Sequence, residues 1–221
     1  MADLWETVAL SLVMSHLACA DDHISPKNAQ QRACFDTIRA AFPAALTSLA
    51  NSAGILLGRE YHYDLVRPGI ALYGGHPQRQ GENPFRRVVR LMGRILQIRQ
   101  AAQGETVGYG ATRRLDRPTH IAVVAAGYAD GLFRALSAGD SETGLTAYLG
   151  PSAAPVLGRV SMDLVSVDVT DVPEAFRQRG AWVELLGPNV SPHEMASQAG
   201  TIDYEVLTSL GGRATRRYIG L

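Results

Sequence analysis

Apolar and polar positions follow two different patterns along this chain, and the change falls near residue 85. Before it, apolar runs of strand length stand at 10–20, 46–54 and 64–75, with a helix-like stretch between the first two. Continuous apolar runs are typical of buried parallel strands, and intervening helices indicate βαβ units. We therefore expect residues 1–84 to be part of a (β/α)8 barrel, which needs about 250 residues when complete.

The helix-like stretch carries its own start and stop signals. Ser25 and Pro26 place a serine at the cap and a proline at the first helical position. Pro43 marks the end. The apolar residues that recur at helical spacing are Cys34, Phe35, Ile38, Ala41 and Phe42.

After the polar, turn-rich segment 76–86 the pattern becomes that of a β protein. Strand-like segments stand at 88–99, 119–129, 154–171 and 181–187. Val165, Val167 and Val169 alternate with polar residues, as in a half-buried strand. Residues 191–194, Ser-Pro-His-Glu, form a capping box that starts a short helix. We expect residues 85–221 to form a small β-barrel or sandwich.

Composition excludes few classes of function. The chain has 221 residues, 46% of them hydrophobic, and no net charge, so nothing attracts it to nucleic acid or a membrane surface. Residues 8–20 are too short to span a bilayer, and the acidic residues 1–7 are the wrong flank for a signal peptide. Cys19 and Cys34 lack metal-ligand spacing, which predicts buried, reduced thiols in a cytoplasmic protein.

Seven ordered motifs carry a resemblance that spans essentially the whole chain. They are MSHLACADD (14–22), LANSAG (49–54), DLVRPGIALYGG (64–75), TVGYGATRRL (106–115), AAGYADGLFR (125–134), GRVSMDL (158–164) and TIDYEV (201–206). Together they resemble the alanine racemase family, enzymes that use pyridoxal phosphate to interconvert L- and D-alanine and supply D-alanine for peptidoglycan. The resemblance implies the last part of a (β/α)8 barrel followed by the C-terminal β-domain of that family.

The resemblance also implies roles for single residues. His16 matches the residue that stacks on the pyridine ring, and Arg67 matches the one bonded to the ring nitrogen. The phosphate contacts are Ser52, Gly69, Ile70 and Tyr204.

Substrate chemistry is implied in the second half of the chain. Tyr109 matches the catalytic tyrosine base, and Met162 matches the residue whose backbone N–H holds the substrate carboxylate, with Asp163 next to it. Tyr128, Arg134 and Arg159 match the lining of the substrate channel. Family members pair head to tail as homodimers, so the tyrosine of one subunit is expected to reach the cofactor of the other.

Two departures from the family change the expectation. The family holds its cofactor as a Schiff base on a lysine of the first barrel strand, whereas the only lysine here is Lys27, at an expected helix start. We therefore expect this chain alone to be inactive. Ser48 stands where many members have a histidine that supports the ring arginine. A racemase for serine or lysine, or an inactive association domain, remain as alternatives.

Overall fold

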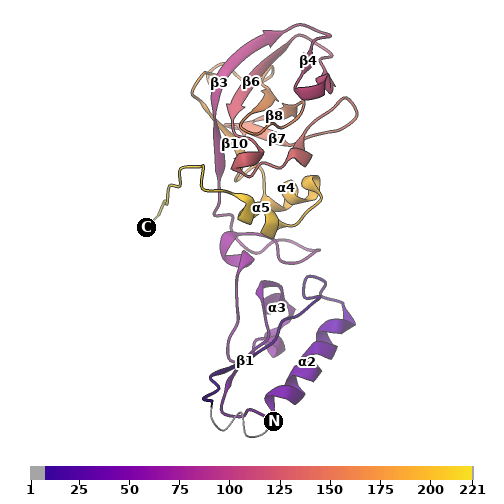
Figure 1. Ribbon diagram of the computed structural model, residues 1–221, viewed down its shortest axis with the longest axis vertical. Coiled ribbons are helices and arrows are strands. Elements are labelled where there is room, and N and C mark those ends of the chain that lie inside the picture. The colour runs from indigo at the N-terminus through magenta and orange to yellow at the C-terminus, as the bar shows by residue number, and fades with distance from the viewer. Residues whose placement is uncertain (1–7, 221) are drawn as a thin grey trace. The chain divides into compact units, whose positions relative to one another are not determined.

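The structure, a computed structural model, describes residues 8–220. The chain divides into two compact units, Met1–Arg86 and Arg87–Leu221 (Figure 1). Residues 1–7, on which the expectation about a signal peptide rests, lie outside the described residues. No helix formed by residues 8–220 has both the length and the apolar character needed to cross a membrane.

The first unit begins with a βαβ arrangement, as the sequence predicts. Strands β1 (Leu12–Met14) and β2 (Leu46–Ser48) pair in parallel, and helix α2 (Pro26–Arg39) connects them. The helix starts at the predicted residue, with Pro26 in its first turn, but the Ser25 side chain makes no capping hydrogen bond.

The predicted third strand is wrong. Within residues 64–75 only Arg67 forms a β-bridge, an isolated parallel one to Asn51, although the Asp64 and Leu65 N–H groups also donate to the Thr47 carbonyl oxygen. Pro68 has no N–H to donate to a ladder, and the 3-10 helix η2 (Ile70–Tyr73) follows directly.

The apolar run 46–54 is only partly a strand, because β2 ends at Ser48. Helix α3 (Ser52–Leu57) starts within the same run, because the Asn51 side chain accepts a hydrogen bond from the Gly54 N–H and caps it. The 3-10 helix η1 (Arg59–Tyr61) follows.

Several apolar side chains of the first unit are less buried than expected for strands and helices of a (β/α)8 barrel. Helix α2 buries Phe35 against Leu17 and Leu49. Cys34, about 100° round the helix from Phe35, is exposed, and Cys19 is half-buried, so the expectation of two buried thiols is wrong. Met14 at the end of β1 is 59% exposed.

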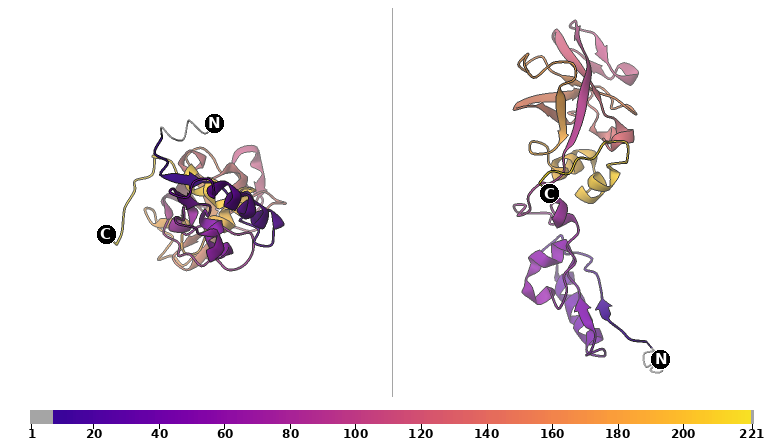
Figure 2. Two further views of the ribbon diagram at one scale, coloured as in Figure 1. Left: turned by 90° about the horizontal axis from the view of Figure 1, so that it is seen from below. Right: turned by 90° about the vertical axis from the view of Figure 1, so that its left-hand side faces the viewer.

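The second unit is a closed barrel, which settles the alternative between barrel and sandwich. The strand order is β10-β3-β6-β9-β8-β7, and all neighbours are antiparallel. The strands are β3 (Leu91–Ala101), β6 (Thr119–Ala125), β7 (Thr146–Leu149), β8 (Ser152–Leu157), β9 (Val165–Asp168) and β10 (Trp182–Leu186). They curve around one interior, as Figures 1 and 2 show.

Two strand predictions need correction. The expected strand 154–171 is two strands, because Gly158 adopts a left-handed φ of 72° and turns the chain between β8 and β9. Strand β7 was not predicted, and its pairing with β10 through Tyr148 and Glu184 closes the barrel.

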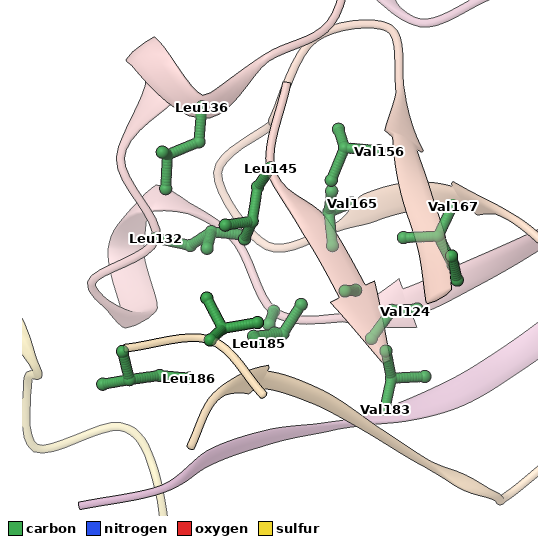
Figure 3. Packing of buried hydrophobic residues seen from close by; sticks show 14 of the residues in the cluster. Val124, Leu132, Leu136, Leu145, Val156, Val165, Val167, Val183, Leu185 and Leu186 are labelled. Carbon is green, nitrogen blue, oxygen red and sulfur yellow. The ribbon is translucent and has the colours of Figure 1, made fainter. Parts of the chain in front are cut away.

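The barrel interior is filled by side chains that alternate along the strands. Val165, Val167 and Val169 are at most 1% exposed, while Ser166 and Asp168 are half-buried, which confirms the predicted alternation. Figure 3 shows Val165 and Val167 directed at the interior with Leu132 and Leu185.

Short elements complete the second unit. Strands β4 (Thr106–Val107) and β5 (Arg113–Arg114) enclose the 3-10 helix η3 (Tyr109–Ala111). Two further 3-10 helices, η4 (Tyr128–Asp130) and η5 (Arg134–Leu136), follow β6. Helix α4 (Pro192–Ala199) has the predicted capping box between Ser191 and Glu194, and α5 (Asp203–Ser209) comes after it.

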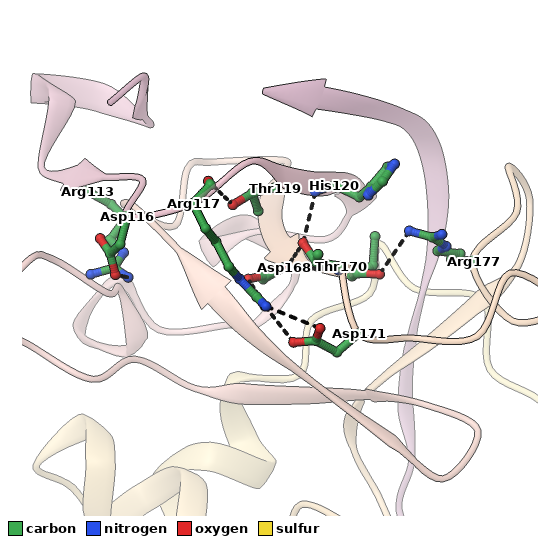
Figure 4. Close-up of polar contacts among 10 residues, drawn as sticks. Arg113, Asp116, Arg117, Thr119, His120, Asp168, Thr170, Asp171 and Arg177 are labelled. Carbon is green, nitrogen blue, oxygen red and sulfur yellow. Dashed lines mark hydrogen bonds and ion pairs between the residues drawn. The ribbon is translucent and has the colours of Figure 1, made fainter. Parts of the chain in front are cut away.

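One ionic cluster joins the segments that flank two barrel strands. The Arg117 guanidinium, just before β6, pairs with Asp171 and lies 3.6 Å from Asp168, at the end of β9 (Figure 4). The His120 N–H donates to the Thr170 hydroxyl at 2.9 Å across the same boundary. The cluster joins the segments beside the paired strands β6 and β9, and the charges of Arg117, Asp168 and Asp171 are paired with one another.

Candidate functional site

The centre of the first unit's polar site is the Arg67 guanidinium. Its Nη1 donates to Ser48 Oγ at 2.6 Å, and its Nη2 donates to the carbonyl oxygens of Ser15 at 2.7 Å and Leu49 at 3.4 Å. These acceptors follow or end the parallel strands β1 and β2, whose carboxyl ends meet at one edge. Burial lowers the pKa of Arg67, but an arginine remains protonated near neutral pH.

His16 lies at the same edge, with its two ring nitrogens facing two donors. Nδ1 is 3.5 Å from Arg67 Nη2, and Nε2 is 3.1 Å from Asn51 Nδ2. The Asn51 Oδ1 already accepts from the Gly54 N–H at 2.8 Å, so its Nδ2 must face the histidine. By this hydrogen-bond assignment Nε2 accepts from Asn51 Nδ2–H. The ring is exposed, so a planar group can stack on it.

Ser52 organises a second part of this edge. Its Oγ accepts from the Gly69 N–H at 2.8 Å and the Ala71 N–H at 3.3 Å, which leaves its own O–H as a donor. Among residues 8–220, the Ile70 N–H between them has no acceptor. A Cβ built on Gly69 would meet nothing within 4 Å, so the approach is open. An O–H donor beside an N–H donor fits a phosphate group.

The second unit holds the predicted base in a glycine turn. Tyr109 is 69% exposed and lies between Gly108 and Gly110, both with left-handed φ angles, of 81° and 75°. A Cβ on Gly108 would lie 2.8 Å from the Arg159 backbone nitrogen, and one on Gly110 would lie 3.0 Å from Arg159 Nη1. Only glycine therefore lets this turn lie against Arg159, which places a positive charge beside the turn that carries Tyr109.

The Tyr128 and Met162 segments are joined backbone to backbone. The Tyr128 N–H donates to the Ser161 carbonyl, and the Ala129 N–H donates to the Met162 carbonyl, both at 3.0 Å. Within the described part of the chain the Met162 N–H donates to no acceptor, and the residue is 53% exposed. An unpaired N–H in such a residue is a suitable donor to a carboxylate.

The two arginines matched to the substrate channel line one open pocket of about 490 Å³, together with Thr112 and Ser137. Met162 and Tyr128 do not line it. Tyr204 lies in α5 of the second unit and is 42% exposed. No group of three or more His, Cys, Asp or Glu side chains within residues 8–220 could hold a metal ion.

Sequence reasoning missed two residues of these sites. Asn51 orients His16 and caps α3, and its signal is the preference of asparagine for the position before a helix. Arg213 donates to Asp163 at 2.7 Å and lies 3.4 Å from Asp130. No local pattern marks Arg213, because both contacts are distant in sequence.

Comparisons with known proteins identify the family. The model of "Alanine racemase, C-terminal domain" matches residues 88–218, and that of "Alanine racemase, N-terminal domain" matches residues 2–77. An alanine racemase of Rhodospirillum rubrum is 51% identical over 95% of the chain, and a biosynthetic alanine racemase of Agrobacterium fabrum is 47% identical over 94%. The chain covers 55% of the length of each of these two relatives.

A solved structure agrees with the sequence relatives. The alanine racemase of Bartonella henselae, a crystal structure with covalently bound pyridoxal phosphate, has a TM-score of 0.89 and 39% identity. The similarity covers 99% of this chain and 59% of that one. Because the C-terminal family model alone matches more than half of the residues, this chain belongs to the alanine racemase family.

Proposed function

We propose that this chain takes part in the pyridoxal-phosphate-dependent interconversion of L- and D-alanine. The observation that carries the proposal is the edge at the ends of β1 and β2, where the Ser52 hydroxyl and the Ile70 N–H stand ready for a phosphate and Arg67 is held in place. In this proposal residues 1–84 contribute the last part of a (β/α)8 barrel, and residues 85–221 form the C-terminal domain.

The residues at this edge have distinct proposed roles in binding the cofactor. Ser52, Gly69 and Ile70 bind the phosphate, with Tyr204 as a further contact. Arg67 donates to the pyridine nitrogen, and because a guanidinium keeps its own proton, that nitrogen stays unprotonated. His16, oriented by Asn51, offers its exposed ring face for stacking. When bound, the cofactor supplies the electron sink that makes the Cα proton of an amino acid acidic.

The second unit supplies the substrate contacts in this proposal. Racemisation removes a proton from one face of Cα and returns one to the other face, so two bases are needed. The exposed Tyr109 phenol serves one face, and Arg159 lies against the glycine turn that carries it. The Met162 N–H holds the carboxylate, with Asp163 next to it in the chain and the Tyr128 segment bonded to it. Arg134 and Arg159 line the substrate channel through the open pocket that they share.

Lys27 cannot serve as the second base or as the covalent holder of the cofactor. It is exposed in the first turn of α2. We therefore propose that the reaction requires a lysine-bearing N-terminal half of the family type, and that the active protein is a cytoplasmic homodimer in which each Tyr109 serves the cofactor of the other subunit.

The test joins this chain to the N-terminal half of the Rhodospirillum rubrum relative. We expect this fusion to racemise alanine, and Tyr109→Phe to reduce the rate about 10²–10⁴-fold, since phenylalanine keeps the ring but has no exchangeable proton. The kcat/KM values for the L-to-D and the D-to-L reactions must fall equally, because their ratio is the equilibrium constant, which is one for a racemisation. Solvent deuterium should still enter one enantiomer, through the remaining base.

The matched control is Tyr218→Phe, which changes a tyrosine that is 77% exposed and has no proposed role. A loss of less than about threefold in the Tyr109→Phe fusion would show that Tyr109 is not a catalytic base. Assays with serine and lysine enantiomers decide between alanine and the alternative substrates.

A further inference from the structure

Arg213 links three segments of the second unit that meet at the proposed carboxylate donor. It lies in the turn after α5, where its Nη2 donates to Asp163 Oδ1 at 2.7 Å and its Nε lies 3.4 Å from Asp130 Oδ1. The other oxygen of Asp130 accepts from the Gly127 N–H at 2.9 Å. One guanidinium thus joins the Tyr128 segment, the Met162 segment and the end of α5.

The backbone around this guanidinium is packed too closely to rearrange in small steps. A Cβ on Gly127 would lie 2.3 Å from the carbonyl oxygens of Ser161 and Met162, and one on Gly131 would lie 2.6 Å from the Ser209 carbonyl oxygen. The position of the Met162 N–H therefore depends on how the Tyr128 segment and the end of α5 are held.

Arg213 compensates two negative charges, those of Asp163 and Asp130, that lie near the proposed carboxylate donor. Asp163 directly follows Met162, so an anion approaching the Met162 N–H meets this carboxylate and that of Asp130 close by. Two uncompensated negative charges would repel a carboxylate ligand. Hydrogen bonding to Asp163 and the nearby negative charge of Asp130 raise the pKa of Arg213, so its positive charge persists.

We propose that Arg213 is a positioning residue for substrate binding. It neutralises Asp163 and clamps the Met162 segment, so that the Met162 N–H can donate a hydrogen bond to an amino-acid carboxylate. This inference rests on the proposed function, but the clamp itself can be tested on the 221-residue chain without any catalysis.

The first experiment measures backbone hydrogen exchange in the 221-residue chain. Arg213→Met keeps the length of the side chain and removes its charge, and Arg213→Lys keeps the charge. The control is Arg217→Met, which changes an exposed arginine of the same tail that has no ion pair among residues 8–220. We expect exchange at residues 127–131 and 161–164 to rise about tenfold in Arg213→Met alone. Unchanged exchange would overturn the clamp.

The second experiment uses the fusion with the Rhodospirillum rubrum half and propionate, a carboxylate that cannot racemise. A carboxylate is bound equally in the ground and transition states, so we expect Arg213→Met to raise KM for alanine and Ki for propionate about tenfold. The kcat should stay within about threefold, and Arg213→Lys should restore most of the affinity.

Each other outcome has a defined meaning. Unchanged KM and Ki would overturn the role of Arg213 in carboxylate binding. Equal losses of kcat in Arg213→Met and Arg213→Lys would indicate a purely structural role and overturn it as well. A parent fusion that racemises no amino acid would overturn the proposed function, and the carboxylate role with it, while the exchange result would still decide the clamp.

Discussion

Ser48 Oγ lies 2.6 Å from Arg67 Nη1 and fixes the direction of that guanidinium. The serine is completely buried and donates its own proton to the Leu65 carbonyl at 2.6 Å. Its hydroxyl therefore bridges β2 to the segment that carries Arg67. A serine in this place has no charge to gain or lose near neutral pH, so this hydrogen bond to Arg67 does not depend on the ionisation of its acceptor.

Removing this hydroxyl tests the bridge. Ser48→Ala leaves the Leu65 carbonyl and one Arg67 N–H without their partner, so we expect the free energy of unfolding of the first unit to fall by about 1–3 kcal/mol. Urea unfolding followed by circular dichroism measures the change. Thr37→Ala, which removes an exposed hydroxyl from α2, is the control. A change equal to that of the control would show that the bridge contributes nothing.

The stability of the first unit should depend on acid through Asp64. The Thr47 hydroxyl and N–H both donate to Asp64 Oδ2, and these bonds lower the pKa of the Asp64 carboxyl. The unfolded chain then binds a proton more readily than the folded one. The contribution is present above the ordinary aspartate value of about 4 and is lost as pH falls through that value and below it.

The measurement compares urea midpoints between about pH 6 and pH 3 for the parent chain and Asp64→Asn. The variant should lose part of the acid dependence. Glu82→Gln, which changes an exposed acid without a hydrogen bond or ion pair among the described residues, should retain it. Parallel pH profiles of the parent chain and Asp64→Asn would contradict the assignment.

A chain of these 221 residues should not hold pyridoxal phosphate covalently at Lys27. The side chain is exposed at the start of α2, and a solvated ammonium is a poor nucleophile. Incubation with the cofactor, borohydride reduction and mass spectrometry should give no stoichiometric adduct that disappears in Lys27→Arg. No conversion of L-alanine should be measurable. A stoichiometric Lys27 adduct together with racemisation would refute this expectation.

Local signals in the sequence determined much of this protein. The start of α2 at Pro26, the alternation of Val165 and Val167, and the Ser191 capping box each depend on residues within a few positions of one another. The seven motifs indicated the family for the same reason, since each motif is a short stretch read in order.

Tertiary structure decided what short stretches do not contain. The apolar run 64–75 resembles a strand, yet only Arg67 bridges a neighbour, because a strand exists only where another segment completes its hydrogen bonds. The contact between Asp163 and Arg213 spans 50 residues and forms only once the barrel has brought both segments together. Sequence patterns report local geometry, whereas the hold on Arg67 and the charge balance at Met162 are properties of the folded chain.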